Sequence, residues 1–255
     1  MPESAPRPAV PVRSGPGAGG IPAGDAATPP PIKGFLETSF LDWRGLVSAV
    51  LFLPGCNFRC PFCHNFTLVS RPEQYQTLEL SLVLERLKTF TGWIDGVVIT
   101  GGEPTIHAGL PALIRVLRSS GFKVKLDTNG YRPGVLESLL DQGLLDMVAM
   151  DLKAPLEPLA YARAAGGAVD LERIGRSVRL LQDSGVAHEF RTTLLPAWHP
   201  EPELAKMAVT LAGARRWTLQ AMNPATAWNQ KVLGQLPAYA PEEMDRLRQT
   251  FGLGD

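Results

Sequence analysis

The chain has 255 residues, 45% of them hydrophobic, and its 25 basic and 25 acidic residues give a formal net charge of zero. This is the composition of one ordinary globular domain with a core large enough to need no disulfide bonds. The charge balance gives no support for nucleic-acid or polybasic membrane binding, and no apolar run suits a transmembrane helix or a signal peptide. We therefore expect a cytoplasmic protein that binds neither nucleic acid nor membrane.

The first 32 residues differ in composition from the rest of the chain. They are rich in proline, alanine and glycine and contain few large apolar side chains. Such a segment cannot bury enough surface to offset the entropy lost on ordering, so residues 1–32 are expected to form a disordered tail. The folded domain is expected over residues 33–224. A C-terminal extension over residues 225–255 should end in an amphipathic helix that starts near Pro241.

Apolar segments of strand length alternate with amphipathic segments of helical period along the folded part. The strands are expected at residues 46–53, 96–100, 123–126, 147–150, 189–195 and 217–221. The helices are expected at residues 78–90, 110–118, 135–142, 171–183 and 202–212. Nearly continuous apolar strands separated by helices indicate a parallel sheet with helices outside. Six units are too few for a closed eight-stranded barrel, so we predict an α/β fold, an open partial (β/α)6 barrel.

All three cysteines of the chain follow the first predicted strand, in the spacing C-x3-C-x2-C: Cys56, Cys60 and Cys63. Thiols packed so closely are typical of a metal or cluster site and not of a disulfide framework. They also require a reducing setting. A structural zinc site needs four ligands, and the nearest fourth ligand, His64, directly follows Cys63 and would tend to point away. An iron–sulfur cubane on three thiolates leaves one iron open for a reactive ligand. A zinc-binding interaction module remains as an alternative.

Polar residues recur just past the carboxyl ends of later strands, where parallel sheets build their ligand sites. Gly101 and Gly102 leave a backbone free of side chains that a ligand can approach closely. Glu103, which follows them, could accept hydrogen bonds from a cationic amino group. Taken alone, this segment would be an ordinary turn.

Two further strand ends carry charged or amide side chains, and the fifth strand carries an arginine. Asp127-Thr128-Asn129-Gly130 would by itself be a turn, since Asn-Gly favours positive φ. Asp151 and Lys153 project to the same side of an extended segment, and a local ion pair is the alternative to a ligand site. Arg191, on the fifth strand, could pair with a ligand carboxylate or form a salt bridge at the rim of the barrel. His107, His188 and His199 have no partner identifiable from the sequence and are expected to be surface or capping residues.

The cysteine segment resembles a known family. C-x3-C-x-aromatic-C, with Phe62 as the aromatic residue, is similar to the cluster motif of the radical S-adenosylmethionine (SAM) enzymes. The continuation Cys63-His64-Asn65 resembles the activating enzymes of glycyl-radical proteins, especially those of anaerobic ribonucleotide reductase and pyruvate formate-lyase. The resemblance runs from about Gly34 to about Pro224 and implies the same partial barrel.

The resemblance also implies the cofactors and the reaction. A [4Fe–4S] cluster would be held by Cys56, Cys60 and Cys63, with SAM on the open iron. The implied activity is that of an oxidoreductase that cleaves SAM reductively and abstracts a glycine Cα hydrogen from a partner glycyl-radical enzyme, here anaerobic ribonucleotide reductase. Flavodoxin or ferredoxin would donate the electron. A radical SAM enzyme acting on a small molecule or another protein is the alternative.

By the same resemblance, the strand ends would line the SAM site. Gly101, Gly102 and Glu103 would contact the SAM amino group. Asp127 and Asp151 would help bind a monovalent cation beside the SAM carboxylate. The other residues that the resemblance places at the SAM site are Thr128, Asn129 and Lys153. Arg191 is expected to contact SAM from its position on the fifth strand and not from the resemblance. The segment 220–224 stands where the pyruvate formate-lyase activase has a histidine near the adenosine, so the adenosine contacts are not assigned.

Overall fold

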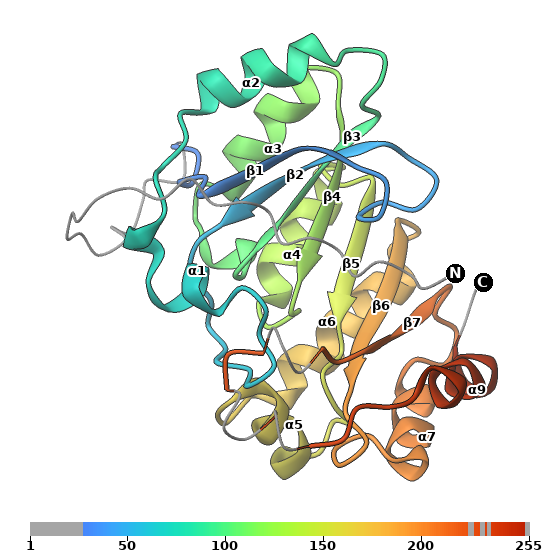
Figure 1. Cartoon of the computed structure of the whole chain (residues 1–255). Helices are drawn as coiled ribbons and strands as arrows, with labels where there is room; N and C mark the ends of the chain where they lie inside the picture. Colours follow the sequence, from blue (N-terminus) through green and yellow to red (C-terminus); the bar gives the residue numbers. More distant parts are fainter. Residues whose placement is uncertain (1–27, 224–226, 230–232, 234–235, 253–255) are drawn as a thin grey trace. The chain divides into compact units, whose positions relative to one another are not determined.

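The computed structural model describes residues 28–223, 227–229, 233 and 236–252. Seven strands form one sheet in chain order, from β1 to β7 (Figure 1). β1 pairs antiparallel with β2, whereas the pairs β2–β3, β3–β4, β5–β6 and β6–β7 are parallel. The predicted open α/β barrel is confirmed as a mostly parallel, unclosed sheet with helices.

The bounds of the elements agree closely with the expected ones. The strands are β1 Gly34–Ser39, β2 Ser48–Leu53, β3 Gly96–Gly101, β4 Lys123–Thr128, β5 Met147–Asp151, β6 Ala187–Leu194 and β7 Trp217–Ala221. The α-helices are α1 Phe66–Ser70, α2 Leu80–Thr89, α3 Leu110–Ser119, α4 Pro133–Asp141, α5 Pro158–Ala165, α6 Leu171–Asp183, α7 Glu201–Thr210 and α9 Pro241–Phe251. The described residues also form the 3-10 helices η1 Pro72–Gln74 and η2 Pro104–Ile106. The sequence did not predict β1, α1 or α5.

The chain divides into two compact units, and the first contains β1, β2, β3 and most of β4. It comprises the described residues up to Cys56 together with Thr67–Leu126 and Leu144–Asp146. Its core includes the side chains of β2 and β3, of which Val50, Leu51 and Ile99 are fully buried. Strands covered on both faces need such continuous apolar runs, which is why the sequence located them.

Ordered structure in the first unit begins before Gly34. Ile32, the last residue of the expected tail, is 1% exposed and forms an isolated bridge with Leu78. The Leu78 N–H donates to the Ile32 carbonyl at 2.8 Å. The expected tail over residues 1–27 lies outside the described residues.

The second unit contains residues 57–66, 127–143 and the described chain from Met147 onward, including β5, β6 and β7. Helices α7 and α9 lie side by side (Figure 1), and Arg246 of α9 pairs with Glu201 of α7 at 2.7 Å. The Arg248 Nε–H donates to the Leu219 carbonyl of β7 at 3.2 Å. The helix expected near Pro241 is therefore present as α9, and the Arg248 hydrogen bond connects it to β7 of the sheet. Among the described residues, no helix combines the length and apolar character needed to cross a membrane.

Candidate functional site

The segment between β2 and α1, residues 54–65, carries the three cysteines and is called the cysteine loop here. It begins with Pro54 and Gly55. Gly55 has φ of 73°, which glycine adopts at low cost. None of Cys56, Cys60 and Cys63 is in a disulfide bond; Cys56 belongs to the first unit, and Cys60 and Cys63 belong to the second. The Cys63 N–H donates to the Cys60 carbonyl at 3.0 Å, so these two cysteines share one tight turn.

The thiols of Cys60 and Cys63 favour the protonated form when no metal is bound. Burial raises the pKa of the Cys60 thiol, and burial together with the neighbouring Cys60 raises that of Cys63 to about 11. A coordinating metal removes such thiol protons outright, so a cluster would replace them. In the described part of the chain, no three His, Cys, Asp or Glu side chains are already grouped around one metal position. The donor set fits an iron–sulfur cluster, and the ligand assignment remains a prediction from the spacing.

Aromatic side chains pack the loop into the second unit. Phe58 is 6% exposed and meets the Tyr131 ring edge-on, with 5.5 Å between centroids. Phe62 is 7% exposed and meets the Trp198 ring edge-on at 6.2 Å. The Lys153 Nζ lies 5.8 Å from the Phe62 ring centroid. The predicted SAM residue Lys153 is thus close to the aromatic residue that precedes Cys63.

In the first unit, the end of β3 is fastened to the turn that leads into Cys56. The Gly102 N–H donates to the Leu53 carbonyl and the Glu103 N–H donates to the Gly55 carbonyl, both at 2.8 Å. A Cβ on Gly102 would lie 1.7 Å from the Gly55 carbonyl oxygen, so only glycine fits there. Gly101 has φ of 115°, a second position that favours glycine. The Gly-Gly pair therefore allows two strand ends to approach each other closely.

Glu103 itself is 1% exposed, and its carboxylate is held by a near neighbour. Its Oε1 accepts hydrogen bonds from the Thr105 N–H at 3.0 Å and from the Thr105 hydroxyl at 2.6 Å. The carboxylate therefore caps η2 and is oriented before any ligand binds. A buried, oriented carboxylate is a suitable acceptor for an ammonium group.

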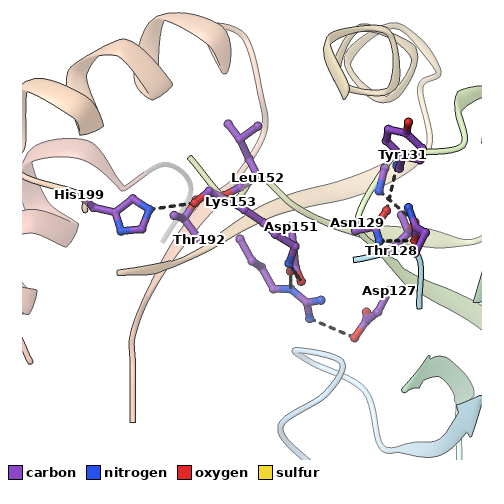
Figure 2. A network of polar contacts seen from close by, with 12 residues as sticks. Asp127, Thr128, Asn129, Tyr131, Asp151, Leu152, Lys153, Thr192 and His199 are labelled. Carbon is purple, nitrogen blue, oxygen red and sulfur yellow. Dashed lines mark hydrogen bonds and ion pairs between the residues drawn. The ribbon is translucent and has the colours of Figure 1, made fainter. Parts of the chain in front are cut away.

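The Asp-Thr-Asn-Gly segment at the end of β4 is a buried turn in the second unit. The Gly130 N–H donates to Thr128 Oγ1 at 3.1 Å, and the Tyr131 N–H donates to Asn129 Oδ1 at 3.0 Å (Figure 2). The Asn129 side-chain amide donates to Asn57 Oδ1 at 2.9 Å. This contact joins the turn to the cysteine loop. Asn57 was not singled out from the sequence, because nothing but its place between two cysteines marks it.

The remaining predicted residues form one ion-pair network. The Arg191 guanidinium, on β6, lies 3.1 Å from Asp127 and 3.1 Å from Asp151. The Lys153 Nζ lies 3.3 Å from Asp151, so the local ion pair considered for these two residues is present. Two acids and two bases therefore converge in the second unit: Asp127, Asp151 and Lys153 at the ends of β4 and β5, and Arg191 within β6. Parallel strands end at one edge of a sheet, which predicts that the residues at the ends of β4 and β5 lie close together.

Electrostatics stabilise the charged forms of this network. Burial acts to raise the pKa of Asp151, but the charges of Lys153 and Arg191 outweigh it and hold that pKa below its ordinary value. Burial likewise acts to lower the pKa of Arg191, and Asp127 and Asp151 reverse this and raise it. The Asp151 side chain is 39% exposed and thus accessible from solvent, whereas the Asp127 side chain is 10% exposed.

A second set of contacts holds the Leu152–Lys153 backbone. The His199 Nδ1 accepts a hydrogen bond from the Leu195 N–H at 3.1 Å, so the proton of the neutral ring is on Nε2. Nε2 points at the Lys153 carbonyl, 2.9 Å away (Figure 2). The Thr192 hydroxyl donates to the Leu152 carbonyl at 2.8 Å. Hydrogen bonds from Thr192 and His199 to the backbone carbonyls therefore hold the segment that carries Asp151 and Lys153.

The expectation of surface or capping histidines is wrong for two of the three. His199 is 0% exposed, and His188, a residue of β6, is 5% exposed. The Nε2 of His107 lies 2.8 Å from the Pro54 carbonyl, next to the turn into the cysteine loop. A single histidine carries no periodic pattern, so the sequence held no signal for these contacts.

Known proteins resemble the chain over most of its length. Residues 50–208 match the family model described as Radical SAM superfamily. A Methanocaldococcus jannaschii protein named "Putative glycyl-radical enzyme activating enzyme" is 30% identical over 220 residues, 85% of this chain and 89% of that protein. The 7-carboxy-7-deazaguanine synthase of Aquifex aeolicus is 41% identical over 86 residues, 34% of this chain and 37% of that protein.

Solved structures share the fold. TYW1 with a lysine-pyruvate adduct bound has a TM-score of 0.57 and 18% identity, and the match covers 81% of this chain and 74% of that one. At this identity the likeness concerns the fold alone. The family match spans the cysteine loop and every strand end described above up to β6, and membership implies a [4Fe–4S] cluster and SAM as cofactors. The chain is a radical SAM enzyme and belongs to the radical SAM superfamily.

Proposed function

We propose that the chain activates a glycyl-radical enzyme by removing a Cα hydrogen from one of its glycines, with anaerobic ribonucleotide reductase as the expected partner. The similarity to the relative named as an activating enzyme carries this proposal, because it spans 89% of that protein. The Cys63-His64-Asn65 continuation of the cluster motif supports it. The proposed setting is the reducing cytoplasm, with flavodoxin or ferredoxin as the electron donor.

In this proposal the three cysteine thiolates bind the cluster, and the residues at the end of β3 bind the amino group of SAM. Cys56, Cys60 and Cys63 would hold three irons of the cluster. When bound, the cluster would supply one electron to the SAM sulfonium, which gives methionine and a carbon-centred radical able to take a hydrogen atom from glycine. Glu103 would accept hydrogen bonds from the SAM amino group, and the Gly101–Gly102 backbone, which carries no side chains, would let that group approach.

The residues predicted on β4, β5 and β6 would also contact SAM. Lys153 and Arg191 are fixed cations that can attract the SAM carboxylate, and the carboxylates of Asp127 and Asp151 hold Arg191 in place. Thr128 and Asn129 would line the site from the end of β4. His199 and Thr192 would keep the Leu152–Lys153 backbone in position without touching SAM.

An anaerobic assay with the partner protein tests the proposal. The reconstituted and reduced enzyme is mixed with SAM and the host's anaerobic ribonucleotide reductase, and electron paramagnetic resonance follows the radical. A glycyl-radical doublet on the partner would establish activation. Substitution of the partner's glycine by alanine should remove the doublet, which serves as the control.

A second candidate is a radical SAM enzyme that acts on a small molecule or another protein. The 41% identity to a 7-carboxy-7-deazaguanine synthase over 86 residues favours it, although that match covers 34% of this chain. SAM cleavage with no doublet on the reductase would favour this candidate over the activase. The zinc-binding module is distinguished by metal analysis, because it would contain zinc and neither iron nor sulfide.

A further inference from the structure

A segment near the C-terminus is bound to the loop that carries Cys60 and Cys63. The Trp228 indole N–H donates to the Cys60 carbonyl at 2.8 Å. The N–H of the next residue, Asn229, donates to the Pro61 carbonyl at 3.4 Å. The Trp228 ring also stacks on Phe66, with 4.0 Å between centroids and 9° between ring planes. Trp228 and Asn229 thus contact residues before Cys63 in the sequence, Cys60 and Pro61, and one after it, Phe66. All of these residues belong to the second unit.

Neighbouring residues anchor this segment. Ala227 is 1% exposed and Leu233 is fully buried. The Leu233 N–H donates to the Asn229 carbonyl at 2.9 Å. Trp228 itself is 41% exposed, so burial in the core does not account for its place. Its single N–H donor is nevertheless directed at the backbone of one of the proposed cluster ligands.

We propose that Trp228 is a positioning residue for the cluster: it holds the Cys60–Phe66 loop in the shape its thiolates need. The inference rests on the proposed cluster ligands. Hydrogen bonds to groups next to a metal ligand fix the ligand's orientation, and their loss weakens metal retention. Stacking on Phe66 adds a second attachment beyond Cys63. A loop released from Trp228 should still be able to form the cluster but should lose its iron faster.

Iron retention by the reconstituted holoenzyme tests the proposal. Iron transfer to a chelator is followed by absorbance in wild-type protein, Trp228→Ala and Trp228→Phe. We expect Trp228→Ala to lose iron about tenfold faster than wild type, the size of effect usual for residues that hydrogen-bond to metal ligands. Trp228→Phe keeps a ring to stack but has no N–H, so its rate should be intermediate. Trp93→Ala, which removes a tryptophan that is 79% exposed in the first unit, should match wild type.

A measurement on the metal-free protein separates this inference from the proposed function. Iodoacetamide alkylation of each cysteine is timed by mass spectrometry. Cys60 is 8% exposed, and the Trp228 indole N–H binds its carbonyl. Loss of this contact in Trp228→Ala should loosen the loop and speed alkylation of Cys60, while alkylation of Cys56 keeps its rate. Thermal unfolding of the metal-free variants confirms that they are folded. Unchanged alkylation of Cys60 and unchanged iron loss in folded Trp228→Ala would overturn the proposal. Wild-type protein that holds no iron would overturn the cluster assignment and this inference with it.

Discussion

The guanidinium of Arg191 and the carboxylate of Asp127 form an ion pair at 3.1 Å, and the Arg191 side chain is 19% exposed. The same guanidinium lies 3.1 Å from Asp151. Arg191 therefore links the two carboxylates that the family resemblance assigns to a monovalent cation. A partly buried pair of carboxylates needs a positive charge between them, and here a side chain of the protein supplies it.

We expect SAM binding by the wild-type enzyme to be unchanged when tetramethylammonium replaces sodium and potassium, because Arg191 already balances Asp127 and Asp151. Arg191→Met should weaken SAM binding about tenfold, as expected for the loss of a charged hydrogen-bonding group, and make it depend on potassium or sodium. Equilibrium dialysis with labelled SAM measures both effects. Arg173→Met, which removes an exposed arginine paired with Asp170, is the matched control. Cation dependence in the wild type would instead place a monovalent cation at these carboxylates.

Glu103 is expected to have two separate roles. Its negative charge should strengthen SAM binding, and its hydrogen bonds to Thr105, which cap η2, should stabilise the fold. Glu103→Gln keeps an oxygen that can accept from Thr105 but removes the charge, so SAM affinity should fall about tenfold with little change in melting temperature. Isothermal titration of the reconstituted enzyme measures the affinity, and an iron assay checks the cluster content.

Thr105→Val is the control for this experiment. It removes the hydroxyl that donates to Glu103 at 2.6 Å and leaves the carboxylate in place. We expect a lower melting temperature and nearly normal SAM affinity. If Glu103→Gln binds SAM as tightly as wild type, the carboxylate has only the capping role seen in the structure.

Gly102 should tolerate no side chain. A Cβ there would lie 1.7 Å from the backbone oxygen of Gly55, directly before Cys56. Gly102→Ala should lower the free energy of unfolding by about 2 kcal/mol, the usual cost of overpacking, and reduce the iron bound per chain. Urea denaturation and iron analysis measure these effects. Gly134→Ala, at a position with nothing within 4 Å of the added Cβ, should be neutral or slightly stabilising. Equal stability of the two variants would contradict the close approach of the strand ends.

The sequence predicted the elements whose side chains are buried on both faces. Val97, Val98 and Ile99 mark β3 because a parallel strand covered by helices must be apolar throughout. β1 was missed because five of its six residues are only partly buried, and it pairs antiparallel with β2 at the start of the sheet. α5 has only eight residues, too few to show a clear helical period, although Pro158 at its start and Gly166 just after its end are typical limits of a helix.

In the candidate site, too, the sequence predicted the features that follow from a pattern and missed those that depend on single side chains. Strand-end position predicted that Asp127, Asp151 and Lys153 would meet, because parallel strands end at one edge. Position could not show that Arg191 would pair with both acids, since this depends on side-chain direction. The contacts of His199 and Trp228 are made by single residues far along the chain from their partners. No spacing rule relates such residues, and only the folded chain brings them together.

The stability of the metal-free protein should depend on pH through His199. Burial lowers the pKa of this histidine below its ordinary 6.5, Arg163 lowers it further, and Glu203 and two backbone hydrogen bonds act against this. As the pH falls below about 6.5, the unfolded chain takes up this proton before the folded chain does, so the folded state loses stability. His199→Gln should lose less stability than wild type between pH 7.5 and pH 5.5 in urea denaturation. An identical loss in both proteins would show that other groups cause the pH dependence.

The most direct test of the account is the formation of 5′-deoxyadenosine from SAM by the reconstituted and reduced enzyme, compared with Cys60→Ala. The wild type should release 5′-deoxyadenosine and methionine in equal amounts, measured by chromatography under anaerobic conditions. Cys60→Ala should release neither, because the cluster would lose one of its three ligands. SAM cleavage retained in Cys60→Ala, or no cleavage by wild-type protein with a full complement of iron and sulfide, would contradict the account.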